Sequence, residues 1–331
     1  MTIRRHLVFV VLALFSLTAP LHAQAVIWDL INEYPATSLT GEGDAFFAQA
    51  VKEQTKGRVV VRPIPEAASG LRSREHLKAV ADGRFAMASS FGGSLGQQSP
   101  VFLLSSLPFV TASPKDARAL LAQAQPLYEK AFIAHEQKLL YVSPWPASGI
   151  WSTTPVNSVE ALKSLKIRTY DTTGTEVFSR VAASAAVISF SDLTPKLESG
   201  EINAVLSSGD GGAGRQLWKY LHNFSDILYA VPLSFTTVSL KAWNALDAKT
   251  QAAVLEAAKE TTDRQWDALA NRTDQNFARM RANGVTIDEH PPAAVMDALR
   301  QAAQDSITAW EQSAGPEAKA LLDAYRAAKK P

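Results

Sequence analysis

Hydrophobic residues recur along this chain with two alternating periods. The segments 25–31 (AVIWDLI), 58–64 and 85–90 are short apolar runs of the kind that forms buried strands. The segments 43–55 and 73–83 carry apolar residues at threes and fours, which indicates helices. This order of strand, helix, strand, helix and strand predicts a largely parallel sheet covered by helices.

The same pattern restarts after a helical stretch at 114–137. A second series of strand-like and helix-like segments follows at 139–145, 158–165, 166–171, 175–184, 186–190, 192–200 and 202–208. Two separate series predict two α/β lobes in one chain. We expect the first lobe to comprise 26–145 with a return at 233–273. The second lobe would comprise 146–232 with C-terminal helices in 274–331.

One helix is predicted to be long enough to join the lobes. Between Asp247 and Asn283 the chain has no Pro or Gly, and its apolar residues recur at threes and fours. At about 1.5 Å per residue, an unbroken helix of this length would reach roughly 55 Å, which is longer than one lobe is wide. Two helices with a hidden break between them remain the alternative.

The first residues have the pattern of a secretory signal peptide. Arg4 and Arg5 precede an apolar run at 7–17, and the small-residue motif Ala-Gln-Ala follows at 23–25. The run is well short of the roughly 20 residues that a membrane-spanning helix needs. We therefore expect residues 1–25 to be cleaved near Ala25 and the mature protein to lie in the periplasm. An uncleaved N-terminal anchor is the alternative.

Composition narrows the classes of function. Removing the two arginines of residues 1–25 from the 33 Lys and Arg leaves 31, against 32 Asp and Glu, so no strongly basic surface for nucleic acid is expected. The chain has no cysteine, which excludes disulfides, a thiol nucleophile and cysteine-based zinc sites. With 47% hydrophobic residues, the chain has enough apolar side chains for two cores.

Three short motifs resemble catalytic or binding signatures without completing them. The segment 92–96 (GGSLG) matches the G-x-S-x-G nucleophile elbow, but the following GQQSP would break the helix that the elbow requires. His135 begins an H-E-x-x-H zinc motif in which Leu139 replaces the second histidine, and the glycine-rich 208–214 lacks the Lys-Ser/Thr of a P-loop. We expect no catalytic residue, metal or cofactor. An exported hydrolase that uses Ser94 is the alternative function.

Arg168 is the strongest candidate for a binding residue. It lies in the middle of a short predicted strand, where its planar guanidinium could hold a carboxylate through two parallel hydrogen bonds. Aromatic residues that could surround it are Trp28, Tyr34, Phe91, Trp145, Trp151, Tyr170 and Trp218. From the residues alone, a structurally paired arginine remains open, and each aromatic is more often a core residue than a ligand contact.

Six stretches of the chain share their pattern with one known family. They are 28–47, 77–93, 103–110, 143–178, 197–208 and 240–260. Together they resemble the extracytoplasmic solute-binding proteins of tripartite ATP-independent periplasmic (TRAP) transporters, in the C4-dicarboxylate-binding group. The resemblance implies a two-lobed α/β periplasmic-binding-protein fold with a long helix across both lobes. It further implies a receptor, not an enzyme, that binds an organic acid between the lobes and delivers it to a TRAP permease.

The resemblance also assigns binding residues. The arginine that holds the substrate carboxylate in the family corresponds to Arg168. Where many members have a second arginine this chain has Trp151, and a usual asparagine contact is replaced by about Ser207. The expected ligand-binding residues are Arg168, Trp151, Tyr34, Phe91, Trp145, Tyr170, Ser207 and Ser208.

The indole of Trp151 in place of a second cation predicts the class of ligand. We expect a monocarboxylate with a flat or hydrophobic body, such as an aromatic acid or a branched 2-oxo or 2-hydroxy acid, rather than succinate or malate. The alternative is that Trp151 points into the core of the second lobe. We also expect the protein to be a monomer. A further possible function is that of a sensor subunit, which would bind the same ligand and report it to a signalling partner.

Overall fold

The computed structural model describes residues 25–329. The predicted signal peptide lies outside this range except for its last residue, Ala25. Within the described part of the chain, no helix is both long enough and apolar enough to span a bilayer.

The first sheet has five strands in the order β2-β1-β3-β10-β4. Its strands are β1 (Val26–Asn32), β2 (Val59–Ile64), β3 (Met87–Phe91), β4 (Gln137–Pro144) and β10 (Leu233–Ser239). β2, β1 and β3 are parallel, whereas β10 is antiparallel to both of its neighbours. The connecting helices are α1 (Leu39–Gln54) and α2 (Ser73–Ala81), which confirms the predicted alternation of strands and helices.

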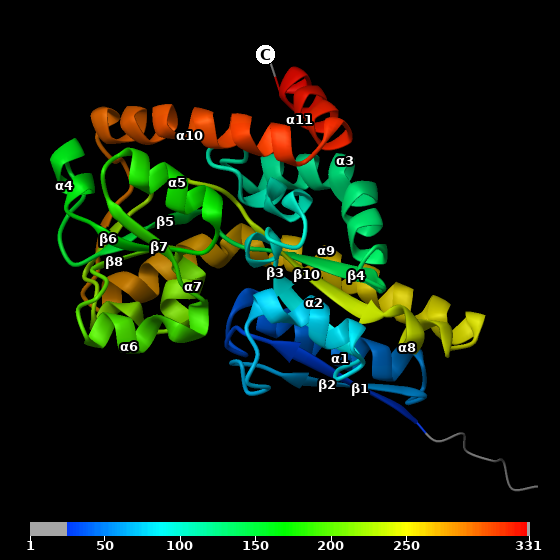
Figure 1. Ribbon diagram of the computed structural model, residues 1–331. Coiled ribbons are helices and arrows are strands. Elements are labelled where there is room, and N and C mark those ends of the chain that lie inside the picture. Colours follow the sequence, from blue (N-terminus) through cyan, green and yellow to red (C-terminus); the bar gives the residue numbers. More distant parts are fainter. Residues whose placement is uncertain (1–24, 330–331) are drawn as a thin grey trace, which may run out of the picture.

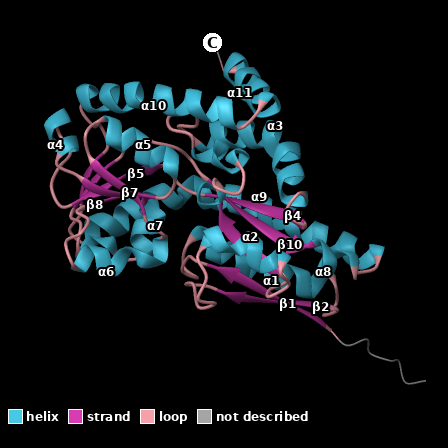
Figure 2. Cartoon of the chain, in the orientation of Figure 1, coloured by secondary structure: helices cyan, strands magenta, loops and turns pink. Residues whose placement is uncertain are grey.

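The second sheet has six strands in the order β11-β9-β5-β8-β6-β7. Its strands are β5 (Ser148–Ser152), β6 (Lys166–Thr169), β7 (Ser184–Val187), β8 (Ala204–Ser208), β9 (Asn223–Ser225) and β11 (Thr286–Asp288). The helices between them are α4 (Val159–Lys163), α5 (Thr172–Arg180), α6 (Leu193–Glu198) and α7 (Gly209–Gly214). The two groups of strands are well separated in space (Figure 2).

One strand counted in the second series belongs to the first sheet, and it falls within the range 26–145 expected for the first lobe. The strand predicted at 139–145 is β4, and it pairs with β10 at the edge of the first sheet. The second sheet instead uses β5, which pairs antiparallel with both β8 and β9. All five residues of β5 are buried, so it lacks the alternation of polar and apolar residues that would have revealed it.

The long helix is continuous, so the two-helix alternative was wrong. α9 (Ala248–Ala282) has 35 residues and begins at Asp247, whose side chain accepts a hydrogen bond from the Thr250 amide. It packs against α1 and β4 at the first sheet and against α7 and β11 at the second. Figure 1 shows it passing behind both groups of strands.

The C-terminal helices lie across the top of the molecule in Figure 1. They are α10 (Ala293–Ser313) and α11 (Pro316–Ala328), and they lie near α3 (Pro114–Ile133). α10 packs on α5 of the second half, whereas α11 packs on α3. Trp310 and Leu322 share one hydrophobic core with Leu120 of α3. The end of the described chain therefore returns to the first sheet.

Candidate functional site

A small cavity with about 280 Å³ of empty space lies between the two sheets. Its lining comes from both halves of the molecule and comprises Tyr34, Phe91, Trp145, Ser148, Arg168, Tyr170, Phe190, Ser207, Ser208, Gly211 and Pro232. Seven of the eight residues expected from the sequence lie here, all except Trp151. Sequence reasoning missed Ser148, Phe190, Gly211 and Pro232, which carry no local signal of a binding role.

Arg168 is fixed in the cavity by backbone carbonyl groups. β6 carries it between β7 and β8, where it is only 3% exposed. Its Nε donates a hydrogen bond of 2.8 Å to the carbonyl oxygen of Ile188, and its Nη1 donates one of 3.0 Å to that of Leu206. These two bonds orient the guanidinium before any ligand arrives.

The protein does not neutralise this cation with an acidic partner. Within residues 25–329, no Asp or Glu oxygen lies within 4.0 Å of the Arg168 guanidinium. Burial lowers the pKa of Arg168, and the more distant charges of Glu33 and Asp171 oppose this shift. A buried charge without a partner is costly, so the site is prepared for an anion.

The two nearby acids already accept hydrogen bonds from other groups. Asp171 accepts one of 2.6 Å from the Ser106 hydroxyl and one of 2.8 Å from the Gly174 amide, where it caps α5. Burial nevertheless raises the pKa of Asp171 to about 6. Glu33 is held in the contacts between the halves described below. Neither carboxylate is free to pair with Arg168.

Aromatic rings form the walls of the cavity. The centroid of the Tyr34 ring lies 4.7 Å from that of Trp145 and 4.6 Å from that of Phe190. The rings of Phe91 and Tyr170 meet edge to face at 5.0 Å. Trp145 donates its indole N–H to the Ser234 hydroxyl over 2.9 Å, so only its ring faces are left for packing.

Hydroxyl groups supply the remaining polar surface. The Tyr170 hydroxyl is buried near Ser148, yet within the described chain it makes no hydrogen bond of good geometry. Ser208 is less available, because its hydroxyl accepts a hydrogen bond from the Gly211 amide and caps α7. Tyr170, together with the lining residues Ser148 and Ser207, could therefore bind a polar atom of a ligand.

Trp151 does not line the cavity, which corrects its expected role as a ligand contact. Its side chain is fully buried and packs edge to face on Phe224, with ring centroids 5.3 Å apart. Its indole N–H donates a 3.2 Å hydrogen bond to the carbonyl oxygen of Ser208. A Cβ at Gly212 would lie 2.1 Å from the indole, so α7 covers the ring closely. In this arrangement the Trp151 side chain packs in the core of the second half.

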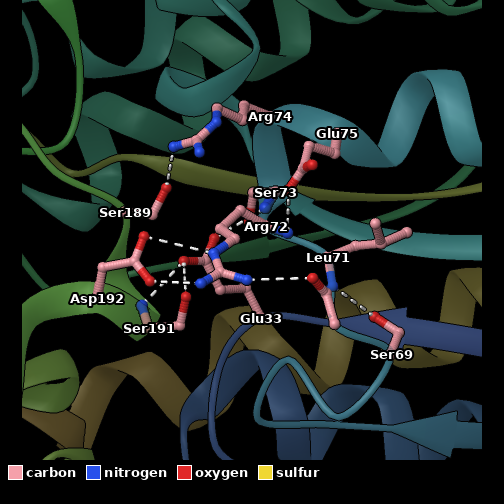
Figure 3. Close-up of polar contacts among 11 residues, drawn as sticks. Glu33, Ser69, Leu71, Arg72, Ser73, Arg74, Glu75, Ser189, Ser191 and Asp192 are labelled. Carbon is pink, nitrogen blue, oxygen red and sulfur yellow. Dashed lines mark hydrogen bonds and ion pairs between the residues drawn. The ribbon is translucent and has the colours of Figure 1, made fainter.

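Polar contacts join the two halves next to the cavity (Figure 3). The Glu33 carboxylate accepts hydrogen bonds from the Ser73 amide at 2.8 Å, the Ser191 amide at 3.0 Å and the Ser191 hydroxyl at 3.1 Å. Arg72 forms an ion pair with Asp192 across the same gap, with Nη2 and Oδ1 2.5 Å apart. These contacts describe a closed arrangement of the halves.

Ser94 lacks the geometry of a hydrolase nucleophile. It lies in a 3-10 turn (Gly92–Leu95) rather than at the start of an α-helix. It lines a separate cavity, and no histidine is among the described residues that line that cavity. The structure therefore gives the Ser94 hydrolase alternative no support.

Comparisons with known proteins agree with this geometry. The family model for bacterial extracellular solute-binding proteins, family 7, matches residues 31–313. Two extracytoplasmic solute receptors of Bordetella pertussis, each binding pyroglutamic acid, have similar structures. The first is 25% identical with a TM-score of 0.87, covering 91% of this chain and 100% of that chain. The second is 26% identical with a TM-score of 0.86, covering 91% and 99%.

A curated relative extends the match at the sequence level. A solute-binding protein of Chromohalobacter salexigens is 22% identical over 299 residues, which are 89% of this chain and 88% of the relative. Family and fold together identify a two-lobed TRAP-type solute receptor rather than an enzyme. The chain belongs to the bacterial extracellular solute-binding proteins, family 7.

Proposed function

We propose that the cavity around Arg168 binds a compact monocarboxylate of about the size of pyroglutamate. The observation that carries the proposal is the buried, pre-oriented guanidinium with no acidic partner among residues 25–329. A ligand carboxylate would supply the missing charge and accept hydrogen bonds from the guanidinium. The closed lobes would then hold the ligand until the receptor meets a TRAP permease.

The size and polarity of the cavity favour a small ring with its own polar atoms. The cavity is small, with about 280 Å³ of empty space even when space open to solvent is counted, so only a compact ligand suits the closed form. Flat aromatic walls suit a flat ring, and the Tyr170 hydroxyl needs a polar partner. A lactam ring supplies both an N–H and a carbonyl group, and two receptors that are 25% and 26% identical bind pyroglutamic acid.

Dicarboxylates and purely aromatic acids fit the cavity less well. No second cation is among the described residues that line it, because Arg215 lies behind Phe190 with its Cζ 5.0 Å from the ring centroid. A second ligand carboxylate would therefore be buried without a partner. Benzoate would leave the buried Tyr170 hydroxyl unpaired, and Trp151, whose indole favoured an aromatic body, does not line the cavity.

The two sheets define the boundaries of the lobes that would close on this ligand. We propose 26–145 with 233–273 as the first lobe and 146–232 with 274–313 as the second. α11 is assigned to the first lobe, because it packs on α3. We further propose that the receptor acts as a monomer after cleavage near Ala25, with described residues from both halves of the chain lining the cavity.

A panel of acids tests the proposed ligand. The purified mature protein would be titrated calorimetrically with L-pyroglutamate, succinate, benzoate and D-glucuronate, with thermal unfolding measured in parallel. We expect pyroglutamate to bind at least tenfold more tightly than the other three and to raise Tm the most. Tighter binding of succinate would contradict the monocarboxylate assignment. Tighter binding of glucuronate or benzoate would contradict the small polar ring.

A further inference from the structure

A second cavity opens beside the Arg168 cavity and is separated from it by Tyr170. Its empty space is about 450 Å³, and its lining includes Ser94, Asp171, Val187 and Ser189. Tyr170 is the one described residue that lines both cavities. Val187 is 49% exposed, so the outer cavity reaches the surface of the protein. The cleft thus has an inner and an outer compartment.

The ring of Tyr170 separates these compartments, and the ring of Phe91, which lines the inner one, packs against it. They meet edge to face at 5.0 Å and are only 4% and 5% exposed. Each ring belongs to a segment that runs from the inner to the outer compartment. Phe91 leads into the turn that carries Ser94, and Tyr170 is followed directly by Asp171. Because the two rings come from opposite halves of the molecule, closing the halves brings them together.

We propose that the Phe91–Tyr170 ring pair sets the upper limit on the length of the acid that this receptor accepts. Opening the pair would let the tail of a longer monocarboxylate run from Arg168 into the outer compartment. This inference rests on the proposed function, because it assumes that Arg168 holds the carboxylate. It names the residues that limit the length of the ligand, whereas Arg168 selects a ligand with a negative charge.

The outer compartment would select apolar tails. The apolar residues Val187 and Ile188 line it, and the Asp171 carboxylate is the acidic group among its described lining residues. An anionic tail would meet the charge of Asp171. The Arg74 guanidinium, whose Nη1 donates a 2.6 Å hydrogen bond to the Ser189 hydroxyl (Figure 3), also lines the compartment, so the described lining carries one charge of each sign. Because these charges oppose each other, the compartment favours an uncharged tail, which would pack on Val187 and Ile188.

The test compares the ratio of octanoate affinity to butanoate affinity in the mature wild-type protein, Tyr170→Ala and Phe91→Ala. Calorimetry would measure binding, and circular dichroism would confirm that each variant is folded. We expect the ratio to rise at least tenfold when either ring is removed, although butanoate itself binds less tightly. Tyr170→Leu and Phe91→Leu, which keep more of the packing, provide the comparison if an alanine variant does not fold.

A blocking substitution tests the path of the tail. Ser94 lines only the outer compartment, so Ser94→Phe alone should leave butanoate affinity unchanged. In the Tyr170→Ala background the same substitution should reverse the gain in octanoate affinity. A gain that persists would show that the tail does not enter the outer compartment, and would overturn this assignment.

The outcomes separate this inference from the proposed function. An octanoate-to-butanoate ratio that rises less than tenfold in a folded variant of either ring overturns the role of the ring pair and leaves the carboxylate receptor intact. Failure of the wild-type protein to bind pyroglutamate contradicts the proposed ligand alone. Absence of binding by any monocarboxylate, in the wild-type protein and in the variants, overturns both.

Discussion

At the scale of single residues, the cavity depends on side chains whose position is set by their neighbours. Arg168 is oriented by two backbone carbonyl groups. One belongs to Ile188, which follows β7, and the other belongs to Leu206, which lies in β8. The sequence indicates the arginine and its chemistry, but not these partners, because they are brought together by strand pairing. The orientation of the Trp151 side chain could not be predicted from the sequence either. Every residue of β5 is buried, so the sequence does not reveal which side chains face the cavity and which face the core.

The close approach of Gly212 to Trp151 leads to a prediction about stability. We expect Gly212→Ala to lower the free energy of unfolding by about 1–3 kcal/mol, because the new methyl group would overlap the indole. Urea unfolding followed by fluorescence would measure the change.

Gly214→Ala is the matched control in the same helix. A Cβ at Gly214 would meet Pro35 no closer than 3.5 Å, an ordinary contact, so we expect a change within about 0.5 kcal/mol. Equal effects of the two substitutions would argue against the tight packing of Trp151 under α7.

At the scale of elements, the sequence predicted best those segments whose apolar residues recur regularly over a long stretch. The absence of Pro and Gly between Asp247 and Asn283 correctly indicated α9, and the alternation of strand and helix correctly indicated the first sheet. The sequence does not show where β4 and α11 pack, because each packs against an element distant in sequence. β4 pairs with β10, and α11 packs on α3. The GGSLG segment forms a 3-10 turn whose role is to pass from β3 into the cleft.

The segment after β1 gives a prediction about closure. Glu33 accepts three hydrogen bonds from Ser73 and Ser191, and the bonds to Ser191 cross between the halves. We expect Glu33→Gln to weaken ligand binding by roughly tenfold to a hundredfold, because hydrogen bonds to a charged group contribute about 1.5–3 kcal/mol to the closed form. Small-angle X-ray scattering should show a more open protein at subsaturating ligand.

Glu129→Gln serves as the comparison, because Glu129 lies on the exposed face of α3 and, among residues 25–329, accepts a hydrogen bond only from Gln125 on its own helix. Its affinity should match the wild type. If Glu33→Gln bound the ligand equally well and scattered identically, the contacts of Glu33 would have no part in closure.

At the scale of the whole molecule, the segments of chain that cross between the two sheets are hydrogen-bonded to one another. The Trp145 amide donates to the carbonyl oxygen of Pro232 and the Ser148 amide to that of Ala230, each over 2.9 Å. α9 makes the third connection. Such connections allow lobes to rotate while remaining attached, so that a ligand shifts the population toward the closed form. Two lobes were predictable from two series of elements, whereas the boundary of the C-terminal helices depends on tertiary packing.

The role of Arg168 is tested by calorimetric titration of L-pyroglutamate into the wild-type protein, Arg168→Ala and Arg168→Lys. Because a ligand carboxylate left unpaired in the buried cavity would lose about 3–5 kcal/mol, Arg168→Ala should bind at least a hundredfold more weakly than the wild type. Arg168→Lys should recover only part of the loss, since an ammonium group lacks the planar fork. Pyroglutamate binding by Arg168→Ala within tenfold of the wild type would contradict the central role of this arginine.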